Sequence, residues 1–198
     1  MEQIPKPKIV KNIKIIAANN INDFEKIAED LRQVYNEAFS RAPWFEPPLS
    51  QEKFQTYFKE LIRDRESILR IAQDENNKII GGKIDGPLRY KKEVRDQVLK
   101  IVDPRVYGDI DSAQNYYGYD TFTRNGGDNQ GVGSFLIDSQ DRFLADKGVQ
   151  NIFRTTNAES EALQSFFQKL GHIVYSQPFP NGVTPAPRVL LQKILSQK

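Results

Sequence analysis

The segment Arg124–Gly133 holds the residue types that most clearly suggest chemistry. It reads Arg-Asn-Gly-Gly-Asp-Asn-Gln-Gly-Val-Gly, follows a tyrosine-rich stretch typical of a β-strand and precedes a helical pattern. Glycines let the backbone approach a phosphate closely, and the free N–H groups at the start of a helix attract anions. The segment therefore predicts either an anion site or a tight strand-to-helix turn without a ligand.

The donors of such an anion site would be consecutive residues where the helix begins: Gln130, Gly131, Val132, Gly133 and Ser134. The chain lacks the Gly-x-x-x-x-Gly-Lys-Ser/Thr pattern of a P-loop. A dinucleotide fingerprint is also a poor match, because no third glycine follows at the right spacing and the segment lies late in the chain. Neither of these two nucleotide-binding motifs is therefore expected.

Side chains suited to acid–base chemistry lie just before the glycine-rich segment. Tyr117 and Tyr119 share one face of the expected strand because side chains alternate along it, and Asp120 follows them. Hydroxyl and carboxyl groups can donate or accept a proton in a reaction. The alternatives are core packing for the tyrosines and a solvent-facing edge position for the carboxylate.

The composition argues against several other kinds of site. The chain has no cysteine and a single histidine, His172, so disulfides, thiolate nucleophiles and ordinary zinc sites are not supported. No Gly-x-Ser-x-Gly accompanies the histidine, which argues against a serine hydrolase triad. We expect no metal, and we expect His172 to begin a strand rather than to act as a base.

Charge and hydropathy point to a globular protein without nucleic-acid or membrane partners. The 198 residues include 12 Phe and 8 Tyr and carry a formal net charge of +2 with no strongly basic tail. A nucleic-acid binder more often shows a clustered basic face. The chain lacks the ~20-residue apolar run of a membrane span and the apolar centre of a signal peptide. We therefore expect a cytoplasmic protein.

Helix and strand patterns mix throughout the chain, so the elements that position these residues should form an α/β (α+β) fold. Residues 1–11 are expected to be an irregular arm, and Asn22 with Glu25 has the spacing of a helix capping box. Strand patterns fall at 13–17, 67–73, 78–84, 114–123, 151–155, 172–176 and 188–194, and helical patterns at 22–39, 50–62, 91–101, 131–147 and 162–170. They predict one sheet of about seven strands with helices on both faces.

This order of elements, over residues 13–194, resembles the GNAT superfamily of acyl-CoA-dependent N-acyltransferases. The pyrophosphate-binding loop of that family reads Gln/Arg-x-x-Gly-x-Gly/Ala, and residues 128–133, Asp-Asn-Gln-Gly-Val-Gly, supply its two glycines. Asp128 stands where a cation or amide is usual, and its carboxylate would repel a pyrophosphate. The resemblance implies one GNAT-type acyltransferase domain over residues 1–198, with a mixed, mostly antiparallel central sheet and acetyl-CoA (coenzyme A) as its cofactor.

A later stretch resembles the last helix of the same family. That helix commonly begins Asn-x-x-Ala, continues with an aromatic pair and ends in Gly; here Ser160 stands at the Asn position and Phe166–Phe167 precedes Gly171. The resemblance places Ser160 and Phe167 beside the cofactor. Many members carry, at the position of Phe167, a tyrosine that protonates the departing CoA thiolate. Phenylalanine cannot donate a proton, so the proton would come from water or another tyrosine.

The resemblance implies that an acceptor amine attacks the thioester directly. The backbone N–H of Phe122 or Thr123 would polarise the thioester carbonyl. Asp120 is the nearest carboxylate and, with Tyr117 and Tyr119, completes the expected catalytic set. The predicted function is N-acetylation of a primary amine. A non-catalytic acyl-CoA-binding or regulatory module is the alternative. Asp128 and Phe167, which both depart from the family pattern, favour it.

The family's acceptor site is usually lined by the loop between the first two helices. Here that loop holds Trp44, Phe45 and Glu46, and an exposed ring beside a carboxylate could hold a cationic amine. Trp44 could equally be a plug that covers the core. Residues 88–113 are a long connection that we expect to be a lid-like insertion. The expected partner is a small-molecule or protein amine, and the expected state is a monomer or homodimer.

Overall fold

The computed structural model describes residues 12–18, 20–41, 44–101, 109–124, 131–179 and 187–195. Within these ranges the chain forms a seven-stranded sheet in the order β1-β2-β3-β4-β5-β7-β6. The strands are β1 (Lys14–Ala18), β2 (Ile68–Gln73), β3 (Ile79–Pro87), β4 (Asn115–Thr123), β5 (Asn151–Asn157), β6 (Ile173–Val174) and β7 (Arg188–Ile194). Neighbouring strands are antiparallel except β4 and β5, which are parallel. The predicted mixed, mostly antiparallel sheet is confirmed.

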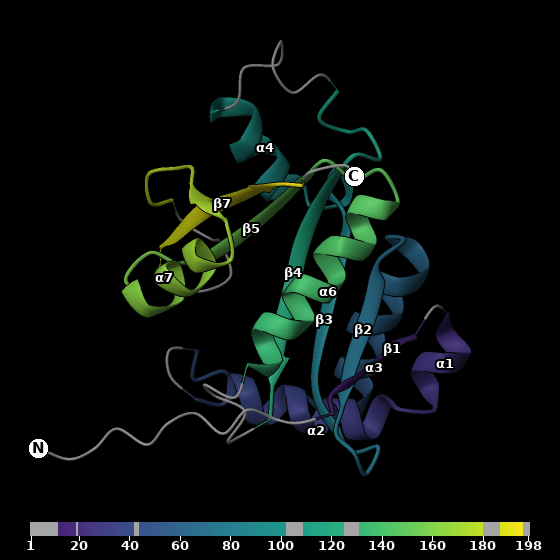
Figure 1. Cartoon of the computed structure of the whole chain (residues 1–198). Helices are drawn as coiled ribbons and strands as arrows, with labels where there is room; N and C mark the ends of the chain where they lie inside the picture. The colour runs from purple at the N-terminus through teal and green to yellow at the C-terminus, as the bar shows by residue number, and fades with distance from the viewer. Residues whose placement is uncertain are drawn as a thin grey trace, which may run out of the picture.

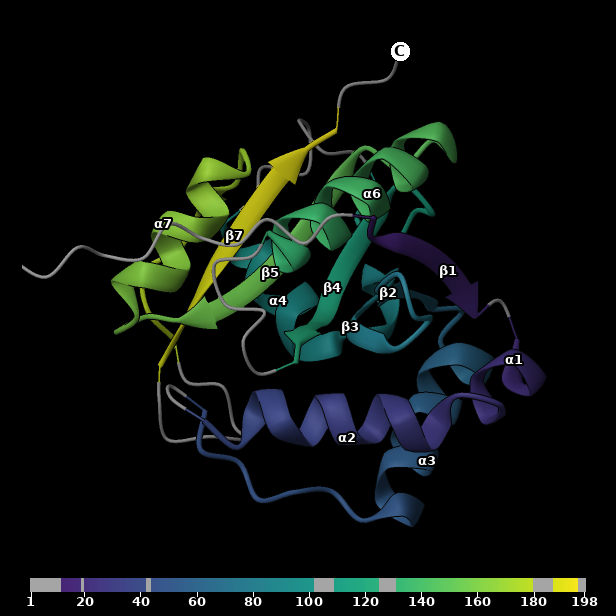
Figure 2. The ribbon, with the colours of Figure 1, turned by 60° about the horizontal axis from the view of Figure 1, so that its bottom comes forward.

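Helices lie on both faces of this sheet. They are α1 (Ile21–Glu25), α2 (Ala28–Phe39), α3 (Gln51–Lys59), the π-helix η1 (Glu60–Asp64), the 3-10 helix η2 (Leu88–Tyr90), α4 (Lys92–Ile101), α6 (Val132–Asp146) and α7 (Glu161–Lys169). α6 packs on β2, β3 and β4, and α7 packs on β5 and β6 (Figure 1). Figure 2 shows α2 and α3 on the opposite face. In the described part of the chain no helix is both long and apolar enough to cross a membrane.

The largest core lies between α1–α3 and the sheet. Phe24, Phe54 and Phe58 are fully buried there, and the rings of Phe24 and Phe58 stack with centroids 5.7 Å apart. Tyr35 meets Phe122 of β4 edge to face at 5.1 Å. Burying one such side chain contributes about 1.5–3 kcal/mol. The packing fixes α2 and α3 against β4, the strand that carries the candidate site.

The first helix begins two residues earlier than the capping box predicted at Asn22. Asn20 is the N-cap: its Oδ1 accepts from the N–H of Asp23 at 3.0 Å, and its amide donates to the Asp23 carboxylate at 3.0 Å. The acidic side chain in the first turn also suits the positive end of the helix. The helix breaks after Glu25, so the single helix predicted over 22–39 is two, α1 and α2.

The parallel pairing of β4 with β5 is short. It covers four residue pairs, from Asn115–Asn151 to Gly118–Arg154, whereas β5 pairs with β7 as far as Asn157. Beyond Gly118 the two strands diverge toward the end at which β4 finishes and α6 begins (Figure 1). The sheet therefore opens in its middle, with α6 on one side of the opening and α7 on the other.

β4 carries a bulge where it leaves β5. Asp85 of β3 pairs with Gly118, but Ile84 pairs with Asp120, so Tyr119 is the extra residue. An extra residue shifts the alternation of every side chain that follows it. Asp120 therefore lies on the same face as Tyr117, the face covered by α2, α3 and α4, and not on the opposite face that simple alternation would give.

The connection from β3 to β4 contains η2 and α4. The helix predicted over 91–101 is confirmed as α4, and its Val94 and Val98 are buried against Tyr117, Phe153 and Leu190. α4 thus forms a fixed apolar contact on the face of β4, β5 and β7. That the wider insertion acts as a lid stays a prediction.

Candidate active site

Asp120 is the centre of a group of polar side chains on the face of α2–α4. Its Oδ2 accepts a hydrogen bond from the Tyr57 hydroxyl of α3 at 2.9 Å. Burial raises the pKa of Asp120 to about 6, while the Tyr57 bond and the charges of Lys91 and Lys83 lower it only in part. A carboxyl with that pKa is mostly ionised at neutral pH and can accept a proton in a reaction. Its surroundings suit Asp120 to the role of a general base.

Tyr117 joins the two strands where they part. Its hydroxyl shares a 2.8 Å hydrogen bond with Oγ1 of Thr155, which lies on β5 one residue beyond the last β4–β5 pair. Burial raises the pKa of Tyr117 to about 12. Because a free thiol has a pKa near 8.5, a phenol of this kind donates a hydrogen bond to a thiolate but keeps its proton.

Tyr119 shares the face of Tyr117, as the alternation predicted. The two rings meet edge to face with centroids 5.1 Å apart. The Tyr119 hydroxyl, however, is buried beside the Arg65 guanidinium, without a hydrogen bond of good geometry, and burial raises its pKa. The structure therefore brings Tyr117 and Asp120 together and directs the Tyr119 hydroxyl elsewhere.

Arg188, the first residue of β7, completes the group. Its guanidinium carbon lies 4.6 Å from the centroid of the Trp44 ring. Burial raises the pKa of Glu46, and the charge of Arg188 lowers it in part. Phe45 is 73% exposed and takes no part. Of the three predicted acceptor residues, the structure thus brings Trp44 and Glu46 to the site. We call Tyr57, Tyr117, Asp120, Glu46 and Arg188 the Asp120 cluster.

Of the two predicted carbonyl-polarising donors, the geometry favours Thr123. The N–H of Arg124 donates to the carbonyl of Ile80 on β3 at 2.8 Å. Successive N–H groups of a strand point to opposite sides, so the N–H of Thr123 points away from β3, into the opening that β5 leaves. The N–H of Phe122 points toward β3, and its side chain is buried in the core.

The start of α6 lies beside the same opening. Gly131 is the N-cap and has φ 81°, a left-handed conformation that favours glycine. A Cβ at Gly133 would lie 3.8 Å from Phe166 of α7 and 3.9 Å from Thr123 of β4. The first turn carries no charged side chain, and its N–H groups have no acceptor within the helix. This end of α6 therefore has the chemistry of an anion site.

The remaining predicted loop donors differ in their surroundings. Val132 is buried with Leu136 against the sheet, and Ser134 is half-buried. Gln130 lies outside the described residues, as does Asp128. The candidate anion site thus consists, among the described residues, of the backbone from Gly131 to Ser134.

The predicted cofactor residues of the last helix both lie on α7 or at its start. Ser160 is the N-cap, and its Oγ accepts from the N–H of Leu163 at 3.4 Å, which leaves its hydroxyl free to donate. The Phe167 ring lies 5.9 Å from the guanidinium carbon of Arg154 and 5.3 Å from the His172 ring. α7 contains no tyrosine, so no phenol reaches the opening from this helix.

A buried ionic network lies on the opposite face, under α6. Lys83 and Asp85 of β3 pair at 2.6 Å with both side chains 0% exposed. Arg154 of β5 donates to Asp141 of α6 at 3.0 Å and lies 3.5 Å from Asp85. Lys193 of β7 donates to Asp141 at 2.9 Å. The network joins four elements at the point where β4–β5 pairing ends.

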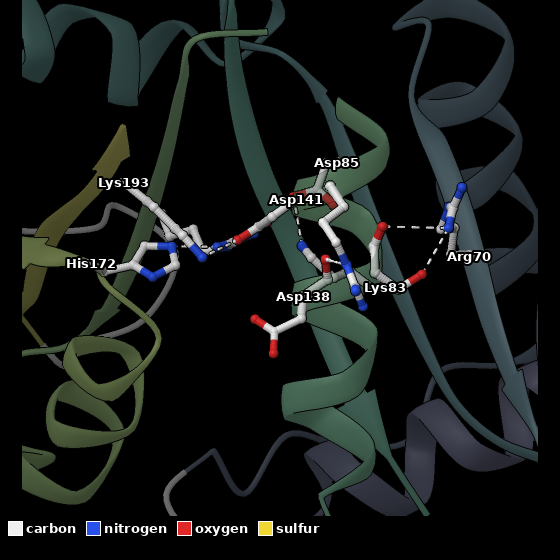
Figure 3. A network of polar contacts seen from close by, with 10 residues as sticks. Arg70, Lys83, Asp85, Asp138, Asp141, His172 and Lys193 are labelled. Carbon is white, nitrogen blue, oxygen red and sulfur yellow. Dashed lines mark hydrogen bonds and ion pairs between the residues drawn. The ribbon is translucent and has the colours of Figure 1, made fainter. Parts of the chain in front are cut away.

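His172 belongs to this network. Figure 3 shows His172 and Lys193 reaching toward Asp141. The His172 ring contacts the Arg154 guanidinium, and burial, together with the charge of Arg154, lowers its pKa to about 3. A buried histidine that stays neutral at physiological pH is not a base for the Asp120 cluster, which lies on the other face of the sheet.

Sequence reasoning missed several residues of these two sites. Tyr57 and Thr155 carried no signal beyond the apolar or strand pattern around them, and Arg188 is simply the first residue of a strand. Lys83 and Asp85 did carry a signal, because two charges at alternate positions of an otherwise apolar strand face the same side. In the described ranges no group of three metal-binding side chains is present.

Comparison with known proteins identifies the fold. No protein-family model matches the sequence, and no curated protein does. An N-acetyltransferase from Staphylococcus aureus Mu50 superposes with a TM-score of 0.65 at 14% identity, over 94% of this chain and 100% of that chain. The ribosomal-protein-S18-alanine N-acetyltransferase from Escherichia coli gives 0.64 at 12%, over 94% and 96%.

A third solved structure was determined with its cofactor bound. The PaiA N-acetyltransferase from Thermoplasma acidophilum, in complex with coenzyme A, superposes with a TM-score of 0.58 at 13% identity, over 92% of this chain and 99% of that chain. Other matching structures are described as acetyltransferases of the GNAT family. The chain therefore has the fold of the GNAT N-acetyltransferases, as its sequence predicted.

Proposed function

We propose that this protein is an N-acetyltransferase that moves an acetyl group from acetyl-CoA to a primary amine by direct attack. The observation that carries the proposal is the opening between β4 and β5. It has an uncharged helix start on one face and, on the other, the Asp120 carboxylate, which accepts a hydrogen bond from Tyr57 but makes no ion pair with a described residue. The N-acetyltransferases that share the fold support the same reaction class.

The residues around the opening fit acetyl-CoA. The backbone of Gly131–Ser134 would hold the pyrophosphate, since helix starts bind phosphates and this one bears no acidic side chain. The N–H of Thr123 would donate to the thioester carbonyl, and the Ser160 hydroxyl is free to donate to the pantetheine arm. Bound acetyl-CoA supplies the activated acetyl group.

Asp120 and Tyr117 would divide the proton chemistry. Asp120 accepts a proton from the attacking amine as the C–N bond forms and the C–S bond breaks. Tyr117, which stays protonated, donates a hydrogen bond to the departing thiolate, and water supplies the thiolate's proton. Phe167 therefore does not need to be a tyrosine. A non-catalytic module would have no use for a base with a raised pKa at this position, which favours the enzyme.

The test is a thermal unfolding scan with and without acetyl-CoA, followed by an assay for released thiol with a panel of amines. Ligand at ~100 times its dissociation constant should stabilise the fold by about 2.7 kcal/mol, a rise of several degrees. Gly131→Val should abolish the rise. Thiol release that depends on an amine would then establish the transferase.

Gly148→Val is the matched control. Gly148 lies just beyond the other end of α6 with φ 83°, and, as at Gly131, a Cβ there would meet nothing within 4 Å. Both changes impose the same backbone strain, so both should lower the unfolding temperature, but Gly148→Val should keep the acetyl-CoA rise. No rise in the unchanged protein at millimolar ligand would reject the proposal, and a rise without turnover on any amine would leave the binding module.

A further inference from the structure

The charged members of the Asp120 cluster form no ion pairs among the residues that the structure describes. Asp120 accepts the hydrogen bond from Tyr57, and Asp120, Glu46 and Arg188 make no ion pair within 4 Å in the part of the chain that the structure describes. In the network under α6, by contrast, each lysine and arginine contacts a carboxylate. Within the described residues, the Asp120 cluster therefore gathers charges of both signs that are not neutralised by an ion pair.

The Arg188 guanidinium is suited to bind an anion with a defined orientation. Its Nε is buried and has no hydrogen-bond partner among the described residues, and burial lowers the pKa of the guanidinium. Its guanidinium carbon lies over the Trp44 ring, 4.6 Å from the centroid, and the N–H donors of a guanidinium form a planar fork. A planar fork of donors fits a carboxylate with two parallel hydrogen bonds.

The two signs of charge lie on opposite sides of the opening. Asp120 follows the bulge on β4, and Arg188 begins β7 opposite Asn157, the last residue of β5. The charge of Arg188 acts on both Asp120 and Glu46, so the three groups face a common region. A ligand there meets negative charge on the side of β4 and α2 and a positive charge on the side of β7.

We propose that the acceptor is a free α-amino acid, whose carboxylate binds to Arg188 while its amine faces Asp120. This inference rests on the proposed function and names the substrate class of the same site. A zwitterion matches the two signs of unpaired charge, and Glu46 attracts its ammonium end. Before the transfer the bound ammonium loses one proton to water, and the resulting amine attacks the thioester. The nitrogen then gains the acetyl carbon and loses its second proton to Asp120 as the C–S bond breaks, and the carboxylate held by Arg188 is unchanged.

Other amine acceptors would leave Arg188 without a partner. The amino terminus of a protein carries an amide where a free amino acid carries a carboxylate, and a polyamine carries neither group. Binding either of them would desolvate Arg188 further without a compensating anion, which is unfavourable. The Asp120 cluster would thus distinguish acceptors by the chemical group on the carbon that carries the amine.

The experiment compares two pools, the proteinogenic L-amino acids and their primary amides, each incubated with acetyl-CoA and the full chain. Mass spectrometry identifies each acetylated product, and the best acid and its own amide are then compared in kcat/KM. We expect the acid to exceed the amide at least ~10-fold. Arg188→Gln should lower kcat/KM for the acid about 100-fold and leave the amide nearly unchanged.

Two further variants test whether the effect comes from the Arg188 guanidinium. Arg188→Lys keeps the charge without the planar fork and should fall between the unchanged protein and Arg188→Gln. Arg63→Gln removes an exposed arginine whose one ion pair among the described residues is with its neighbour Asp64, and it should leave both kcat/KM values unchanged. Each variant is first shown to keep the acetyl-CoA rise in unfolding temperature, which establishes that it folds.

The outcomes separate this inference from the proposed function. Amides acetylated as fast as the acids, an equal loss on both substrates in Arg188→Gln, or turnover of polyamines or peptides alone would overturn the amino-acid acceptor and leave the transferase standing. Binding of acetyl-CoA with no turnover on any amine would reject both. A preference for the acid that depends on Arg188 supports both.

Discussion

Asp120 owes its chemical properties to its position on β4. The bulge at Tyr119 turns its carboxylate to the face of α3, where Tyr57 donates the only hydrogen bond that the structure records for it. Folding removes water from the carboxylate and supplies no cation in contact with it, so its pKa rises to about 6. The same desolvation that raises its pKa also costs stability.

Replacing Asp120 by Asn should separate the cost of the buried carboxylate to stability from its use in proton transfer. Because the folded pKa lies above the unfolded value near 3.9, the folded state binds more protons between pH 4 and 6, and stability falls as pH rises through this window. At pH 7 the ionised carboxylate is unfavourable, so Asp120→Asn should raise the free energy of unfolding by about 1–3 kcal/mol. Denaturant unfolding at pH 7 measures this gain.

The same variant should lose activity. On the proposed function, removal of the general base should cost about 10²–10⁴-fold in rate, and kcat/KM of the unchanged protein should rise with pH to a plateau above about pH 6. Asp64→Asn, at an exposed surface pair, is the control and should alter neither stability nor rate beyond small amounts. An unchanged rate in Asp120→Asn would show that the base is another group.

Among the elements, β4 and its neighbours decide the geometry of the opening. Gly118 is the last residue paired with β5, and the side chain of Arg154 occupies the space where its Cβ would be. A Cβ there would lie 2.7 Å from Nε of Arg154 and 2.9 Å from Oδ1 of Asp85. The ionic network therefore depends on a glycine at this position.

Gly118→Ala should destabilise the protein. The new methyl group must displace Arg154 or Asp85 from their buried contacts, and overpacking of this kind costs about 1–3 kcal/mol. Chemical denaturation compares it with Gly133→Ala, where the nearest atoms lie 3.8 Å and 3.9 Å away and a helical position favours alanine. If the two substitutions had equal effects on the midpoint, the network would tolerate the extra atom.

The sequence predicted the elements well and their registry poorly. The seven strands and the α4 and α6 segments follow from local apolar periodicity, and the GNAT fold from their order. The bulge at Tyr119 depends on how β3 pairs with β4, so alternation alone placed Asp120 on the wrong face. Arg188 reaches the site from 68 positions beyond Asp120 in the chain, and only the tertiary arrangement brings the two residues to the same region. The predicted single helix failed at Lys26–Ile27 because the break depends on packing rather than on composition.

At the scale of the whole molecule, the ionic network ties the two halves of the sheet together. Asp85 of β3 lies beside Arg154 of β5, and Asp141 of α6 joins Arg154 to Lys193 of β7. His172 lies inside it as a neutral ring with its pKa lowered to about 3. Protonation of His172 would place a further positive charge beside Arg154 in a buried region.

His172 should therefore make the fold sensitive to acid. Between about pH 3 and 6.5 the unfolded chain binds a proton that the folded chain does not, so stability falls as pH falls through this window and is unaffected above it. From pH 6.5 to 4 the loss is about 3 kcal/mol. Unfolding free energies of His172→Gln over the same range should lack this loss, and parallel pH curves for the two proteins would rule out the histidine as its source.

The four-pair contact between β4 and β5 has a consequence for motion. The strands β1–β4 and the strands β5, β7 and β6 are each held by antiparallel ladders. The β4–β5 ladder between the two sets has four residue pairs, and the Tyr117–Thr155 hydrogen bond, the buried charges and the packing of α4 support it. The two sets of strands can therefore move relative to each other at the β4–β5 contact without breaking the hydrogen bonds within either set. A ligand that contacts both α6 and α7 would bridge the two sets of strands. Binding of such a ligand would therefore also make the protein more rigid.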